Sequence, residues 1–584
     1  MPYFPSLEVP QTSQLTTQVF YGYDANIRGR DGSFKDMRNM SLRHYPLIST
    51  RTPRRTVRSM FSPGGLIAKD ALYWVDDGAF YANGQAVVGL DLTDGDKQLI
   101  SMGAYIIIWP DKKYVNTQYL TDFGSIDHAY EYTGDVTLTL CRQDGDEYEL
   151  EDAILSDAAP EDPTNGKLWI DTSESIHILN QYSEALGEWA QIATVYIKIS
   201  APGIGMGFST YDGVTISGIE YAGEDEGIKE QVEALNADAV IQAAGDDFVV
   251  VVGIIDQVQT VGGVSIKRQC PDMDFLCESN NRLWGCHYGL VNGKPVNEIY
   301  ASKLGDFKNW KTFMGLSTDS YTVSLGTDGK FTGAVNYQGM PLFFKETCLH
   351  RVHGTAPSSF QVQTTLCRGV QDGSHKSLCQ VGEVLYYKGR TEVLSYDGSL
   401  PQSISQAFGE ENYTGGVAGS IGNLYYLSML DKQGEPLMFV FDRAKNTWCV
   451  EDGVRPEEFA QLDDDLYFIT DHSLMATAGG EEDITWRLDT ATMGFEYPEH
   501  KYLSKWLVRA AASAGARIRF SFMYDSSGYW HDAGEYTGHG LARSFTVPII
   551  PRRCDHMQLR IEGTGDFKLF SLSRVLEKGG DPLC

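Results

Sequence analysis

The sequence predicts an all-β protein built on a β-propeller, with a β-rich domain inserted into it and a C-terminal β-sandwich of the jelly-roll kind. Three observations support this fold class: a recurring aromatic strand, an interruption of that recurrence, and a change to alternating strands near the end of the chain. Aromatic residues make up 12% of the chain and glycine occurs 60 times, as expected for many strands joined by tight turns. A chain of 584 residues is too long for one core, so several domains are expected.

Six segments share a short aromatic strand, which in most cases is followed by a turn signal. The last four recur at about 40-residue spacing, which is typical of four-stranded propeller blades. A blade buries both faces only between two neighbours, so the repeat predicts a ring of blades over residues 61–114 and 271–480. The six segments are Ala71–Trp74, Asn281–Trp284, Met340–Phe344, Glu383–Tyr387, Asn423–Tyr426 and Asp465–Phe468.

The aromatic repeat stops between the first and second of these segments. Residues 115–270 are acidic and contain alternating strands, and Ile228, Val232 and Leu235 have the spacing of one helix face. This stretch is predicted to be an inserted acidic β-rich domain with one helix. Residues 481–584 return to strands of period two separated by Gly- and Asp-rich turns, which predicts the C-terminal sandwich.

The first 60 residues are basic and show little periodicity, so an extended N-terminal arm is expected over residues 1–60. Two interpretations stay open. The arm is either a solvated coil laid over the propeller rim or a contact to an acidic neighbouring subunit. In the second case, several Arg–carboxylate pairs would fix the register of the contact. The contact residues would be Arg51, Arg54, Arg55 and Arg58.

Composition narrows the function classes. The net charge is −30, from 78 acidic and 48 basic residues, which argues against a surface that coats nucleic acid. Residues 1–5 lack the basic start and apolar run of a signal peptide, and the longest apolar run, Phe248 to Ile255, is far too short to span a membrane. No Cys-x-x-Cys pair occurs among the ten cysteines. We therefore expect no cofactor, no metal and no membrane contact.

A search for catalytic motifs gives one weak match. Ser302–Trp310 is similar to the Asp-box turn of sialidases, but the Ser-to-Trp spacing is one residue too long and the turn occurs once. A structural blade turn explains it better. Cys348, His350 and His353 form the best metal cluster, yet on a strand the first two share a face and His353 points away. No nucleophile stands at motif spacing from a base, so the sequence predicts that the chain is not an enzyme.

The C-terminal sandwich contains one candidate for glycan contact. Tyr524, Tyr529 and Trp530 flank the turn at 525–528, and their rings are suited to stacking on a sugar. They are equally suited to a core or a subunit contact, and the sequence does not separate these alternatives.

Several stretches of the propeller and the C-terminal domain resemble a family of virion proteins. These are the propeller nozzle proteins of short-tailed phages, also called tail accessory or packaged-DNA stabilisation proteins, and prophage structural proteins of Firmicutes. The likeness lies in Asn281–Trp284, Asn297–Ser302, Gly305–Trp310, Pro341–Glu346, Gly369–Ser374, Tyr396–Ser399 and Pro548–His556.

The resemblance implies a structural protein of a tailed bacteriophage, made in the bacterial host cytoplasm and placed in the virion tail or neck. It implies a homo-oligomeric ring, with a hexamer as one option, that contacts other neck or tail proteins. The ring would surround the DNA channel and act in DNA retention and ejection without sequence-specific binding. The alternative is a carbohydrate-binding or sialidase-like propeller that acts in host-glycan recognition.

Overall fold

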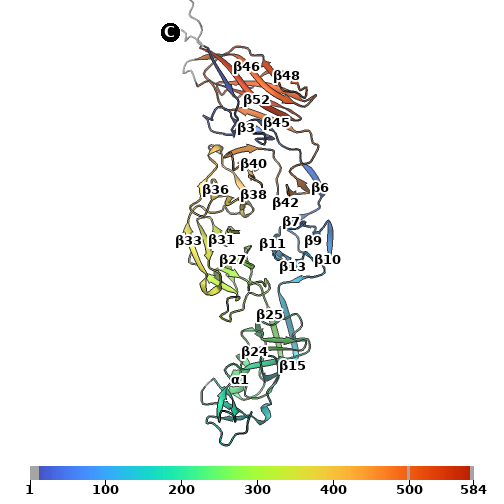
Figure 1. Cartoon of the computed structure of the whole chain (residues 1–584), viewed down its shortest axis with the longest axis vertical. Helices are drawn as coiled ribbons and strands as arrows, with labels where there is room; N and C mark the ends of the chain where they lie inside the picture. The colour runs from blue at the N-terminus through green and yellow to red at the C-terminus, as the bar shows by residue number, and fades with distance from the viewer. Residues whose placement is uncertain (1–11, 175, 496–499, 579–584) are drawn as a thin grey trace, which may run out of the picture.

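Three parts follow one another along the long axis of the molecule: a β-sandwich, a β-propeller and an inserted β-rich domain (Figure 1). The computed structural model describes residues 12–174, 176–495 and 500–578. The predicted fold class is confirmed, since almost every regular element is a strand and the sheets form these three parts. Within the described ranges, no helix has the length and apolar character that a bilayer crossing requires.

Seven four-stranded antiparallel blades form the propeller within the described residues; six are separate sheets, and the sixth blade is part of a ten-stranded sheet. Contacts between neighbouring inner strands, with the short helix η3 (His375–Ser377) beside the fifth blade, run around the ring and return to its start. The blades run from β7 (Pro63–Ala68) to β10 (Gln85–Asp91), β11 (Gln98–Met102) to β14 (Phe123–Ser125), β26 (Phe275–Ser279) to β29 (Tyr321–Ser324), β30 (Gly333–Tyr337) to β33 (Gln361–Leu366), β34 (Cys379–Val381) to β37 (Gln402–Ser403), β38 (Thr414–Ile421) to β41 (Thr447–Val450), and β42 (Glu458–Leu462) to β44 (Ser473–Ala476) with β6 (Arg55–Ser59).

The seventh blade takes its outermost strand from the other end of the chain. β6 pairs antiparallel with β44, with Ser59 opposite Ser473 and Arg55 opposite Ala476. The ring is therefore closed by a strand that precedes the first blade, and the propeller strands extend from residue 55 to residue 476 with the insertion between. The prediction of an extended arm over residues 1–60 is wrong for this strand, because its backbone is hydrogen-bonded into a sheet.

The rest of the N-terminal segment belongs to the sandwich. One sheet has the order β4-β5-β52-β46-β49, where β4 is Met40–Ser41, β5 is Ile48–Thr50, β52 is Phe567–Lys578, β46 is Lys501–Ala512 and β49 is Arg543–Val547. β1 (Thr12–Thr17) pairs with β52, and β50 (Arg553–Cys554) pairs with β46. Residues 12–50 thus contribute strands to the sandwich rather than an arm, and their apolar side chains, such as Phe20 and Met40, are fully buried.

The second sandwich sheet continues directly from the sixth blade. Its strands follow β41 in the order β2-β3-β45-β51-β47-β48. Trp486 and Phe567 stack at 4.0 Å between ring centroids, and Trp506 lies 5.6 Å from Phe522, so large aromatic rings fill the core between the two sheets. The bounds are Gly22–Tyr23 for β2, Ser33–Arg38 for β3, Thr485–Thr490 for β45, Met557–Thr564 for β51, Arg517–Tyr524 for β47 and His531–Thr537 for β48.

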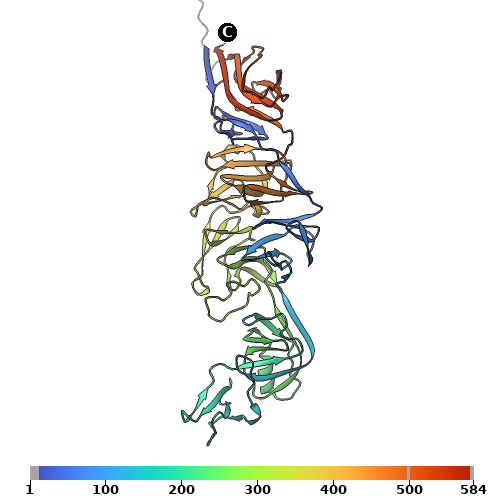
Figure 2. The ribbon, with the colours of Figure 1, turned by 45° about the vertical axis from the view of Figure 1, so that its right-hand side comes forward.

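The inserted domain leaves and re-enters the propeller between the second and third blades (Figure 2). Its two connecting strands, β15 (His128–Cys141) and β25 (Gln259–Arg268), pair with each other, and His128 lies opposite Arg268. The predicted boundary at residue 115 is too early, because β14 still belongs to the second blade. The seven-stranded sheet is ordered β22 (Asp238–Val240), β21 (Gly213–Ser217), β25, β15, β20 (Tyr196–Ser200), β24 (Phe248–Val252) and β23 (Ala243–Gly245).

A smaller sheet and one helix complete the inserted domain. The sheet contains β16 (Ile154–Ser156), β17 (Leu168–Asp171), β18 (Ile178–Ser183) and β19 (Glu188–Gln191). The helix α1 (Glu226–Glu233) begins where Asp225 accepts hydrogen bonds from the amides of Gly227 and Ile228. It buries Val232, as its helical spacing predicts.

Candidate functional site

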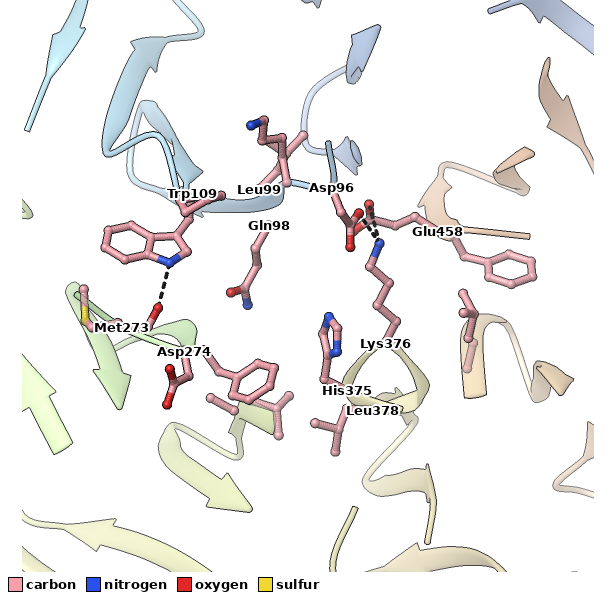
Figure 3. Close-up of a pocket in the computed structure, with 18 residues that line it drawn as sticks. Asp96, Gln98, Leu99, Trp109, Met273, Asp274, His375, Lys376, Leu378 and Glu458 are labelled. Carbon is pink, nitrogen blue, oxygen red and sulfur yellow. Dashed lines mark hydrogen bonds and ion pairs between the residues drawn. The ribbon is translucent and has the colours of Figure 1, made fainter. Parts of the chain in front are cut away.

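A cavity of about 470 Å³ lies where the inner strands of the propeller converge (Figure 3). Its wall comes from blades two to seven, mostly from the inner strands and the segments just before them, with the short helix η3 in the fifth blade and the end of β12 (Tyr105–Trp109) in the second. Because a propeller brings these strand ends to a common axis, residues hundreds of positions apart in sequence face one space. The charged and aromatic residues of the wall are Asp96, Lys97, Trp109, Asp274, Phe275, His375, Lys376, Glu458 and Phe459.

Lys376 joins two carboxylates in this wall. Its Nζ lies 2.6 Å from Oδ1 of Asp96 and 3.8 Å from Oε2 of Glu458. The same Oε2 of Glu458 accepts a hydrogen bond from the amide of Leu66 at 3.1 Å. Figure 3 shows the lysine reaching from η3 toward both acids. Two carboxyl groups from different blades are thus held beside one cation.

Burial shifts the pKa values of Glu458, Lys376 and His375. Removal from water raises the pKa of Glu458 to about 7, although the charge of Lys376 opposes the rise. Burial by itself lowers the pKa of Lys376, but Glu458 and Asp96 outweigh it and leave that pKa above its usual value. Burial, and next the charge of Lys376, lower the pKa of His375. The cavity therefore contains a carboxyl group that exchanges its proton near neutral pH beside a charged lysine.

The opposite part of the wall is built around Asp274. Its carboxylate accepts a hydrogen bond from the amide of Tyr288 at 2.8 Å and lies 3.1 Å from Nδ1 of His287. Trp109 donates its indole N–H to the carbonyl of Met273 at 2.9 Å, which ties the second blade to the third (Figure 3). The cavity wall is thus fixed by hydrogen bonds between blades and not by loops alone.

Two of the predicted subunit-contact residues are buried inside the chain. Arg54 Nη2 lies 2.6 Å from Glu451, and Arg54 Nη1 lies 2.7 Å from Asp452. Arg51 pairs with Glu482 at 2.6 Å and with Asp452 at 3.3 Å. Only 4% of Arg51 and 6% of Arg54 is exposed, so the prediction that these two contact a neighbour is wrong. Their partners are acids of the same chain that the linear sequence places about 400 residues away.

Arg55 and Arg58 lie on β6 at the outer edge of the seventh blade. Arg55 is half exposed and lies 4.0 Å from Asp465. The guanidinium of Arg58 lies over the rings of Trp74 and Tyr81, at 5.4 and 4.9 Å from their centroids. Their contact with another subunit stays a prediction.

The three aromatic residues proposed for sugar stacking do not form one platform. Tyr524 is 5% exposed and belongs to the sandwich core, so stacking on a ligand is excluded for this ring. Tyr529 is 65% exposed. The guanidinium of Arg560 lies 4.1 Å from the ring centroid of Trp530 and covers one of its faces.

The Cys348 strand has the alternation expected from the sequence. Cys348 Sγ and His350 Nε2 are 3.5 Å apart and buried, whereas the ring of His353 bonds to Gln363. His350 is further held by the hydroxyls of Thr327 and Thr364 at 3.1 and 2.9 Å. These threonines give the buried imidazole a structural role. No group of three potential metal ligands occurs among the residues that the structure describes.

The axial residues were not predicted from the sequence. Asp96, Asp274 and Glu458 stand at or just before the start of an inner strand, and Lys376 lies in the short helix η3 that precedes β34. A charged residue recurring at that blade position is a signal that a repeat alignment of the chain with itself would have revealed. Motif spacings lie within one segment, whereas the residues of a propeller site come from different blades.

No family model matches the chain, and no curated protein matches it. Solved structures do match. An exo-β-1,3-galactanase from Phanerochaete chrysosporium, solved with galactose, is 6% identical over 51% of this chain and 94% of its own, with a TM-score of 0.21. A glycoside hydrolase family 43 arabinoxylan arabinofuranohydrolase from Bacillus subtilis is 9% identical over 70% and 95%, with a TM-score of 0.17. The extracellular domain of a hybrid two-component system from B. thetaiotaomicron is 8% identical over 93% and 99%, with a TM-score of 0.21.

The prediction that the chain is not an enzyme is not upheld, since glycoside hydrolases are among the solved structures to which the chain is similar. At identities below 25% and TM-scores near 0.2, these matches carry no argument about the activity or the substrate of this chain. The virion location, the ring and its partners find no support among these structures and stay predictions.

Proposed function

We propose that this chain is a carbohydrate-active β-propeller that binds a glycan in its axial cavity and hydrolyses a glycosidic bond there. The observation that carries the proposal is the placement of Glu458 and Asp96 around Lys376 inside the cavity. Hydrolysis of a glycosidic bond needs one carboxyl group that donates a proton and a second carboxylate. A carboxyl group buried enough to hold its proton near pH 7 is suited to the first role.

In this mechanism Glu458 protonates the oxygen of the leaving sugar. Water attacks the anomeric carbon and gives its proton to Asp96, so that both products leave with complete hydroxyl groups. Lys376 touches both acids and keeps a positive charge between them as the proton moves. Its charge also lowers the pKa of Glu458, which keeps that carboxyl able to release a proton.

The remaining wall suits a sugar. Phe275, Phe459 and Trp109 present apolar surface, whereas Asp274 and His375 supply polar groups. A pocket with a few polar groups among aromatic rings, and a volume between roughly 300 and 1,000 Å³, is typical of small-ligand sites. One or two sugar rings are therefore the expected occupants.

The test measures saccharide release from a panel of polysaccharides and chromogenic glycosides. Glu458→Gln keeps the shape and the oxygen that accepts the Leu66 amide, so it should remain folded and lose turnover by at least about 100-fold. Glu457→Gln is the matched control, because Glu457 precedes the cavity residue without lining it. Glycan retention by Glu458→Gln on an affinity gel would separate binding from chemistry. Equal turnover in both variants, or no release from any substrate by the wild type, would overturn the hydrolytic proposal.

A further inference from the structure

A serine, a histidine and an aspartate form a hydrogen-bonded chain on the C-terminal sandwich, far in sequence from most of the axial cavity residues. Ser526 Oγ lies 2.7 Å from Nε2 of His556, and Nδ1 of His556 lies 3.0 Å from Oδ2 of Asp555. Ser526 is in the turn between β47 and β48, and His556 directly precedes β51. None of the three lines the axial cavity.

The local backbone fixes these side chains. The Asp525 carboxylate accepts the amides of Asp555 at 2.7 Å and His556 at 3.3 Å, and the Asp525 amide donates to the carbonyl of His556 at 3.0 Å. Ser526 has φ of 49°, a left-handed conformation that is costly for a residue with a Cβ. The Phe495 ring stacks beside the imidazole at 5.8 Å between centroids.

The direction of the hydrogen bonds suits nucleophile activation. An ionised carboxylate accepts only, so Nδ1 of His556 donates to Asp555 and Nε2 is left to accept the hydroxyl proton of Ser526. The hydrogen bond from His556, followed by the charge of Lys501, holds the pKa of Asp555 below its usual value. Both heavy-atom distances fall within the roughly 2.6–3.2 Å at which a serine, a base and its orienting group act together.

We propose that Ser526, His556 and Asp555 form a second hydrolytic site, which cleaves small acyl esters. Ser526 Oγ attacks the ester carbonyl carbon as His556 Nε2 takes the hydroxyl proton, and that proton then passes to the departing alkoxide. Water, deprotonated by His556, then attacks the acyl-serine carbonyl carbon; the bond to Ser526 Oγ breaks, His556 returns the proton to that oxygen, and the acid is released. Ser526 is exposed, so the substrate would be an ester on an accessible group, such as an acyl substituent of a polymer. Asp555 acts through His556 as a positioning residue.

The first experiment asks whether Ser526 is an activated nucleophile. The full-length protein is treated with a fluorophosphonate, and the labelled residue is located by mass spectrometry. Ser526→Gly removes the hydroxyl and accepts the positive φ, so it should remain folded and lose the label. Ser527→Ala is the matched control in the same turn and should label as the wild type does. Absence of label on Ser526, or equal labelling of the Ser526→Gly variant, would overturn the proposal.

The second experiment separates chemistry from structure. Hydrolysis of p-nitrophenyl acetate should fall by at least about 100-fold in His556→Asn and Ser526→Gly, the usual size of a lost general base. The rate of p-nitrophenyl acetate hydrolysis should be unchanged in Glu458→Gln. The proposal for Ser526 is therefore tested independently of the proposal for the axial cavity. Rates in His556→Asn and Ser526→Gly equal to the wild-type rate would show that the three residues only fix the turn.

The third readout tests Asp555. Asp555→Asn places an amide where the carboxylate accepts the Nδ1 proton of His556, so labelling of Ser526 should slow. Asp555→Glu keeps a carboxylate beside the ring and should restore part of the labelling rate. An unchanged labelling rate in Asp555→Asn, or no rescue by Asp555→Glu, would assign Asp555 a structural role and contradict its place in the proposal.

Discussion

Replacing Arg54 should destabilise the junction between the N-terminal segment and the propeller. The side chain of Arg54 is 3% exposed and contacts Glu451 and Asp452, whose side chains are 8% and 15% exposed. Arg54→Met fills a similar volume but leaves the two carboxylates with less compensation. Breaking a buried ion pair by removing one partner costs about 3–5 kcal/mol. Because Arg51 still lies 3.3 Å from Asp452, we expect a loss of about 3 kcal/mol in the free energy of unfolding.

The loss should depend on pH. Burial raises the pKa of Glu451, and Arg54 is the main group that opposes this rise. In Arg54→Met that pKa rises further. A folded-state pKa above the unfolded value favours folding at low pH, and this benefit is lost as pH rises through the folded-state pKa. Arg54 also helps to lower the pKa of Asp452, a benefit present only above the unfolded pKa of that group. The effect on Glu451 makes the deficit of the variant larger at pH 8 than at pH 5, whereas the benefit lost at Asp452 is lost at both pH values.

Urea unfolding, followed by circular dichroism and tryptophan fluorescence at pH 5 and pH 8, measures this difference. Arg55→Met is the matched control, because Arg55 is half exposed and 4.0 Å from Asp465, and exposed pairs contribute at most about 1 kcal/mol. Adding Glu451→Gln to Arg54→Met should restore part of the loss, since the buried charge is gone. The reasoning is refuted if Arg54→Met and Arg55→Met lie within 1 kcal/mol of each other at both pH values, a threshold set by the size of an exposed pair.

Three further predictions follow from the structure. Deleting residues 128–268 and joining the ends with a short linker should leave a propeller and sandwich that unfold cooperatively, because His128 and Arg268 are paired neighbours; loss of cooperative unfolding would contradict the insertion. The stability of the wild type should fall as pH rises from about 4.5 toward 7, because the folded pKa of Glu458 is raised to about 7, and Glu458→Gln should flatten this slope in thermal melts. Trp506→Ala should cost about 3–5 kcal/mol, since the ring is fully buried in the sandwich core; a loss below about 1 kcal/mol in urea titrations would show that the site is not packed as described.

The sequence by itself determined the strands, the blade repeat and the place where the repeat is interrupted. These are local properties. Tyr73 and Trp74, or Tyr425 and Tyr426, lie in strands because aromatic residues in short runs between turn residues favour them, whatever the distant chain does. The helix at 226–233 is equally local, since it depends on a cap at Asp225 and on apolar spacing.

Only the tertiary structure decided what the N-terminal segment does and where the candidate sites lie. From the sequence, Arg54 is expected to be an exposed basic residue. In the structure, closure of the ring places Glu451 beside it. Glu458, Lys376 and Asp96 become neighbours only because three blades meet at one axis, and Ser526 meets His556 only because β47 pairs with β51. Such contacts join residues that are 30 to 400 positions apart in the sequence. They are stabilised by the burial that results when distant segments pack together, which no segment achieves by itself. Local propensity therefore predicts the blades, whereas the chemistry between them depends on their packing.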